Sequence, residues 1–150
     1  MEYQKMQHRV IVFAGILALG IVTNAEARRD DERACTLATL NGTYGFTGTG
    51  TIVGLGPVAN VGTIAFDGNG TVSIEVTQSL NGQIARRSFV GVYWVNSNCT
   101  GSADFSGATL DLVIVARGEE LMWIRTNPGL VVTATAKKQA RHPRTTTEGN

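Results

Sequence analysis

Apolar and polar residues alternate with a period of two through most of the chain beyond residue 42. The clearest run covers residues 71–79, where every second residue is apolar, namely Val72, Ile74 and Val76. Successive side chains of a β-strand point to opposite faces, so this alternation predicts half-buried strands. No stretch of this region has a 3.6-residue period long enough for a helix. We therefore expect an all-β domain.

Short turn signals divide this region into consecutive strands. Asn81-Gly82 is the strongest of them, because both residue types tolerate the positive φ angles of a two-residue hairpin turn. The sequences DGNG at 67–70 and NPG at 127–129 are further turn signals. The expected strands cover residues 43–53, 58–66, 71–79, 83–95, 100–105, 109–116, 120–126 and 130–138.

The short links between these strands predict an antiparallel meander. Neighbouring strands joined by tight turns must pair antiparallel. Eight such strands in sequence can close into an up-and-down barrel, which leaves no exposed sheet edge. We expect this eight-stranded barrel. The alternative is a two-sheet β-sandwich, which usually needs longer crossover connections.

The first 27 residues have the parts of a cleaved signal peptide in the usual order. Lys5 and Arg9 precede an apolar run at 10–22, and Ala25-Glu26-Ala27 matches the small-residue cleavage pattern. The apolar run is too short for a stable membrane span, which needs about 20 residues. We predict cleavage after Ala27 and export to the periplasm or the extracellular space. A buried N-terminal helix and an uncleaved anchor are the alternatives.

The remaining chain divides by composition into three parts. Residues 28–34 form a charged leader, 35–138 the barrel domain, and 139–150 a basic and Thr-rich tail that we expect to be disordered. The whole chain has 150 residues, 43% of them hydrophobic, 17% charged, and a formal net charge of +1. These values exclude a disordered protein and a nucleic-acid partner bound through bulk charge.

Residues that commonly carry catalysis are scarce in the expected barrel. The two histidines, His8 and His142, both fall outside it, and the chain has only two cysteines. A zinc site and a Ser-His-Asp triad therefore cannot be assembled there. We expect no metal and no cofactor, and we favour a non-catalytic protein over an enzyme.

The cysteines, Cys35 and Cys99, both lie in the part of the chain that we expect to be exported. Oxidising compartments favour disulfides, so we predict that the two are bonded. Cys35 precedes the first expected strand and Cys99 precedes the fifth. In a meander these positions meet only if the segment before the first strand crosses one end of the barrel.

In several segments the chain resembles a group of small exported bacterial proteins of unassigned function. The resemblance rests on turns, glycines and the two cysteines, namely on Cys35 with residues 40–46, and on residues 62–70, 91–96 and 99–103. At the level of fold the chain is similar to calycin and allene-oxide-cyclase-like barrels. The resemblance covers nearly all of the expected mature chain and implies a fold, not a reaction.

A barrel of this size can be filled by its side chains or can hold one small ligand. Our first hypothesis is that it binds a small apolar or amphipathic molecule. Aromatic side chains, and ionisable ones that can anchor a polar group, are the candidate ligand contacts. They are Tyr44, Phe46, Arg86, Trp94, Asp104, Trp123 and Arg125.

Two other functions stay open at this point. A cofactor-free cyclase or isomerase would need one of the ionisable candidates inside the barrel. A structural protein would assemble through its outer face, and several expected strands carry apolar residues on both faces. The second apolar stripe would mark a homo-oligomer contact and consists of Val113, Val115, Met122, Ile124 and Val131.

Overall fold

The computed structural model describes residues 34–140. The predicted signal peptide at 1–27, most of the leader at 28–34 and most of the tail at 139–150 lie outside the described residues. Within residues 34–140, no helix is both long and apolar enough to cross a membrane.

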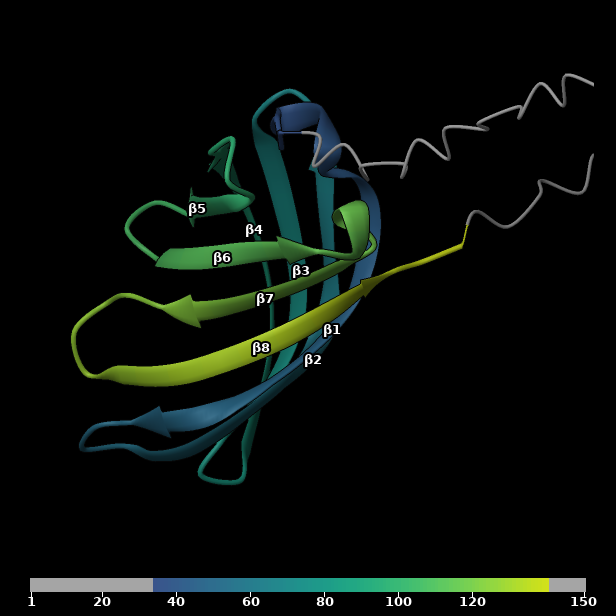
Figure 1. Cartoon of the computed structure of the whole chain (residues 1–150). Helices are drawn as coiled ribbons and strands as arrows, with labels where there is room; N and C mark the ends of the chain where they lie inside the picture. Colours follow the sequence, from purple (N-terminus) through teal and green to yellow (C-terminus); the bar gives the residue numbers. More distant parts are fainter. Residues whose placement is uncertain (1–33, 141–150) are drawn as a thin grey trace, which may run out of the picture. The chain divides into compact units, whose positions relative to one another are not determined.

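The described chain folds into a closed eight-stranded barrel in simple meander order, as predicted (Figure 1). Every pair of neighbouring strands is antiparallel, and β8 returns to pair with β1. The strands are β1 (Asn41–Ile52), β2 (Gly56–Asp67), β3 (Thr71–Leu80), β4 (Gln83–Val95), β5 (Thr100–Asp104), β6 (Thr109–Val115), β7 (Glu120–Arg125) and β8 (Leu130–Lys138). The sandwich alternative is thereby excluded.

The predicted turns form where expected. Asn81 and Gly82 both have positive φ angles, 47° and 86°, and join β3 to β4. Between β2 and β3, the Asp67 carboxylate accepts hydrogen bonds from the backbone N–H groups of Asn69 and Thr71, at 2.7 and 2.9 Å. These bonds favour the charged form and lower the pKa of Asp67.

Two single-turn 3₁₀ helices were not predicted. They are η1 (Leu37–Thr39), before β1, and η2 (Ala116–Gly118), between β6 and β7. Ala116 and Arg117 have positive φ angles of 49° and 57°. Such angles are uncommon for residues with a side chain, and the alternation of apolar residues does not reveal them. The predicted sixth strand, 109–116, is therefore one residue too long.

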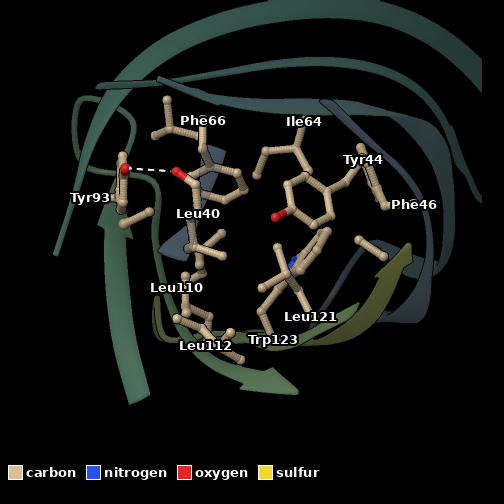
Figure 2. Close-up of a cluster of buried hydrophobic side chains, with 14 of the residues drawn as sticks. Leu40, Tyr44, Phe46, Ile64, Phe66, Tyr93, Leu110, Leu112, Leu121 and Trp123 are labelled. Carbon is tan, nitrogen blue, oxygen red and sulfur yellow. Dashed lines mark hydrogen bonds between the residues drawn. The ribbon is translucent and has the colours of Figure 1, made fainter. Parts of the chain in front are cut away.

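The part of the barrel interior next to η1 is filled by side chains (Figure 2). Tyr44, Leu40 and Leu121 are almost completely buried within this cluster. The ring of Phe66 lies edge-on to Tyr44 and to Tyr93, with centroid distances of 5.6 and 5.0 Å. Edge-to-face contacts of this kind stabilise an aromatic core by more than the burial of apolar surface alone would. This part of the interior is a packed core.

The disulfide closes the barrel end that contains this core. Cys35 is bonded to Cys99, with their Cα atoms 5.0 Å apart. The Cys35 N–H also donates to the carbonyl oxygen of Ser97 at 3.1 Å. The hydroxyl of Tyr93 donates toward the carbonyl oxygens of Leu37 and Leu40, at 2.9 and 3.1 Å. The segment 35–40 is thus held across the barrel end, as the predicted disulfide required.

Candidate functional site

Three of the predicted ligand contacts lie together inside the barrel. Tyr44, Phe46 and Trp123 are buried, and the rings of Phe46 and Trp123 pack with centroids 5.2 Å apart (Figure 2). Their neighbours are the other side chains of the core. The three residues therefore contribute to packing of the filled interior.

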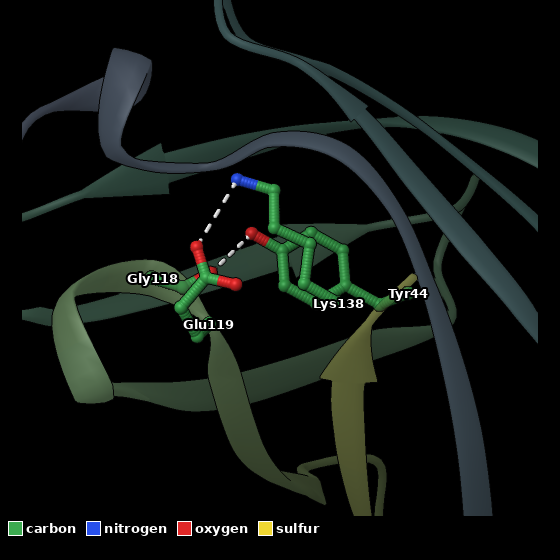
Figure 3. A network of polar contacts seen from close by, with 4 residues as sticks. All are labelled: Tyr44, Gly118, Glu119 and Lys138. Atoms are coloured by element: carbon green, nitrogen blue, oxygen red, sulfur yellow. Dashed lines mark hydrogen bonds and ion pairs between the residues drawn. The ribbon is translucent and has the colours of Figure 1, made fainter. Parts of the chain in front are cut away.

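Tyr44 also joins a polar network at the end of the barrel (Figure 3). Its hydroxyl donates to the carbonyl oxygen of Gly118 at 2.6 Å, and Lys138 Nζ lies 5.8 Å from the ring centroid. The same Lys138 nitrogen lies 3.8 Å from a carboxylate oxygen of Glu119. Burial, assisted by the negative charge of Glu119, raises the pKa of Tyr44 to about 12. The network ties β1 and β8 to η2 and keeps the phenol protonated.

Arg86, Trp94 and Asp104 lie outside the core. Arg86 and Trp94 are exposed on the outer face of β4, with Trp94 54% exposed. The Asp104 carboxylate accepts a hydrogen bond from the Gly107 N–H at 2.7 Å and so stabilises the turn after β5. None of these three contributes a side chain to the packed interior.

Arg125 is on the inward-facing side of β7, in step with Leu121 and Trp123, but at the end of the strand. Its Nε donates to the carbonyl oxygen of Thr109 at 3.2 Å, and its Nη2 donates to Asn127 Oδ1 at 3.0 Å. Partial burial lowers its pKa. These bonds link the end of β7 to β6 and to the turn before β8. The predicted ligand contacts are therefore spread over the core, the outer face and one barrel end.

One hollow on the outer face of the barrel has a volume of about 830 Å³. It crosses five consecutive strands, β5, β6, β7, β8 and β1, and we call it the outer groove. Its lining residues are Thr47, Gly48, Thr49, Asn96, Thr100, Gly101, Ser102, Asp111, Leu112, Val113, Met122, Trp123, Ile124, Thr133, Ala134 and Thr135. A smaller hollow of about 470 Å³ crosses β2, β3 and β4 and includes Arg86.

The strand register explains how the outer groove is built. On each of the five strands the lining is a run of three consecutive residues. The central residue of each run occupies an inward-facing position of its strand, and the other two face outward. Gly48, Ala134, Trp123, Leu112 and Gly101 are these central residues, and they pair directly across the sheet. Their backbone forms the floor, and outward side chains on either side form two walls. Gly48 is required in this row, because a Cβ there would lie 2.8 Å from that of Ala134.

The two walls have similar chemical layouts and differ mainly at β6, where one has Val113 and the other has Asp111. One wall runs through Thr47, Thr135, Met122, Val113 and Thr100. The other runs through Thr49, Thr133, Ile124, Asp111 and Ser102.

Apolar side chains thus lie in the middle of the groove, and hydroxyl groups lie at both ends. The middle is formed by Val113, Met122 and Ile124, all more than 40% exposed. Asp111 is the charged side chain in the lining. Five strands spaced at about 4.8 Å give the groove a length of about 19 Å.

The outer groove was not predicted from the sequence. The sequence does contain the signal, since TGT at 47–49 and TAT at 133–135 have the same alternation. These segments are 86 residues apart by number, and only the pairing of β8 with β1 places them side by side. Of the predicted outer stripe, Val113, Met122, Ile124 and Val131 are indeed exposed.

Within residues 34–140, no cluster of three or more His, Cys, Asp or Glu side chains is arranged to hold a metal ion. No family model matches the chain, and no curated protein matches it at a significant level.

Proposed function

We propose that the protein is an exported, non-catalytic binding protein for a small amphipathic molecule, which it holds in the outer groove. The observation that carries this proposal is the layout of the groove, with apolar side chains in the middle and hydroxyl groups at both ends. Ligand sites typically have volumes of about 300–1,000 Å³ and combine apolar lining with a few polar groups. At about 830 Å³ the outer groove is within this range.

The charge of the lining side chains limits the kind of ligand that can bind in the outer groove. Asp111 is the charged side chain of the groove, and no basic side chain lines it. An anionic head group would meet repulsion and find no cation to pair with. A neutral amphipath whose head carries hydroxyl groups fits better, because threonine hydroxyls both donate and accept hydrogen bonds.

Export is part of the same proposal. The disulfide between Cys35 and Cys99 fits an oxidising compartment. The signal-peptide pattern of residues 1–27 and the resemblance to small exported bacterial proteins favour the same location. Fractionation of expressing cells would distinguish the periplasm from the medium.

Titration calorimetry with octyl β-glucoside below its micelle concentration tests the binding function. Met122→Glu places a charge in the apolar middle of the groove, and we expect affinity to fall about tenfold, which corresponds to about 1.4 kcal/mol. Octanoate, with a similar chain and an anionic head, should bind more weakly than the glucoside.

The matched control is Leu55→Glu. Leu55 is 59% exposed in the turn between β1 and β2 and does not line the outer groove, so this variant should bind like the unchanged protein. Equal affinity of the two variants, or preference for octanoate, would contradict the proposal.

A further inference from the structure

One side of β4 lacks a partner strand over most of its length. β4 pairs with β3 from Gln83 to Val92, but it pairs with β5 only from Val92 to Val95. β5 is far shorter than β4 (Figure 1). Within residues 34–140, no other backbone hydrogen bond fills this side of residues 83–91. The barrel therefore has an open β4 edge, which we define as residues 83–91.

Strand alternation identifies the backbone groups at the open β4 edge. Leu80 and Gln83 close the two-residue hairpin, and the Tyr93 N–H donates to Gly70 on the β3 side. Odd-numbered residues of β4 therefore direct their N–H and C=O groups toward β3. Ile84, Arg86, Ser88 and Val90 direct theirs toward the open edge.

Apolar side chains accompany these unpaired groups on both faces of the strand. Ile84 and Val90 are 61% and 68% exposed on the outer face, and Phe89 is 40% exposed on the inner face. An unpaired edge with exposed apolar side chains is a template for another strand. Arg86 and Arg87 lie in the same stretch and are the charges that a partner must accommodate.

We propose that a second copy of this chain occupies the open β4 edge, with the two β4 strands antiparallel about a two-fold axis at Arg87. This register pairs all four residues that have free backbone groups. Ile84 lies opposite Val90 of the partner subunit, and Arg86 lies opposite the partner's Ser88. On the inner face, Ala85 lies opposite the partner's Phe89. The edge is thus complementary to itself, as a two-fold interface requires.

A register centred on Ser88 is less favourable. It leaves the free groups of Ile84 without a partner and places Val90 opposite Arg86 of the partner subunit. In the register centred on Arg87, the Arg87 side chain lies opposite that of the partner subunit, and the two positive charges repel each other. Arg87 is exposed, so dissolved salt screens the repulsion. Dimerisation should therefore tighten as salt is raised.

Sedimentation equilibrium on protein purified after expression of the whole chain tests the dimer. We expect a monomer–dimer equilibrium, a dissociation constant at least tenfold larger for Val90→Lys, and a smaller one for Arg87→Gln. The matched control is Val131→Lys, because Val131 is 62% exposed on the outer face of β8 and away from the open edge. A protein that stays monomeric at millimolar concentration, or equal effects of the two lysine variants, would overturn the proposal.

Oxidative cross-linking tests the register. Arg87→Cys places two thiols opposite each other at the proposed axis, in a pair without backbone hydrogen bonds, where side chains come closest. We expect a covalent dimer on a non-reducing gel for Arg87→Cys and much less for Ser88→Cys. The reverse order would overturn the register assigned here.

Discussion

Removal of the disulfide is the sharpest test of how the barrel end is closed. Cys35 and Cys99 are 64 residues apart in sequence, and their bond restricts the unfolded chain. For a loop of that length, the loss of closure entropy corresponds to about 4 kcal/mol of stability. Measured values are often smaller, so we expect Cys35→Ser to cost about 2–4 kcal/mol. For a domain of this size, that is a fall in melting temperature of roughly 10 °C or more.

The protein without the disulfide should still fold, because other contacts hold the segment 35–40 in place. Leu40 is buried in the core, and the Tyr93 hydroxyl donates to two carbonyl oxygens of the segment 35–40. Urea unfolding, followed by tryptophan fluorescence with and without reductant, gives the free energy of unfolding in both states. Reductant should destabilise the unchanged protein and leave Cys35→Ser unaffected. Equal stability of the unchanged protein in both conditions would refute the reasoning.

Two further predictions concern Tyr44 in the core and the close packing of Gly50 in β1. Tyr44→Phe removes the bond to Gly118 and should cost about 1 kcal/mol. Because folding raises the pKa of Tyr44 from 10.0 to about 12, its contribution is complete below pH 10 and is lost as the pH rises toward 12. Unfolding measured from pH 9 to 12 should therefore show a smaller decline for Tyr44→Phe, and parallel declines would contradict this reading. Gly50→Ala should cost more than about 2 kcal/mol in urea unfolding, since a Cβ there would overlap the carbonyl oxygen of Val131. Gly45→Ala is its control on the same strand, because a Cβ there comes no closer than 3.5 Å to Gln139, and equal costs would refute the steric argument.

Local sequence signals were sufficient for the architecture. The alternation in β3 and the Asn81-Gly82 turn act over a few residues, and β4 and β8 begin and end where the pattern predicted. The disulfide was predicted from the expected export of both cysteines to an oxidising compartment. In contrast, η2 depends on positive φ angles at Ala116 and Arg117, which few residues with side chains adopt and alternation does not encode.

The candidate site was harder to predict, because it depends on register between distant strands. Aromatic residues were expected to line a cavity, yet Phe46 and Trp123 pack against each other inside the barrel. The outer groove arises from the pairing of Thr47 with Thr135 and of Met122 with Val113. Pairings of this kind follow from barrel closure as a whole, and no short segment contains them.

Chemical-shift mapping of the backbone amides and methyl groups during a titration with octyl β-glucoside tests the binding function most directly. We expect the largest changes at Thr135, Met122, Ile124 and Val113, and little change at the buried Leu121 and Ile64. Changes concentrated on the buried residues, or no change in the outer groove at saturating probe, would contradict binding in the groove.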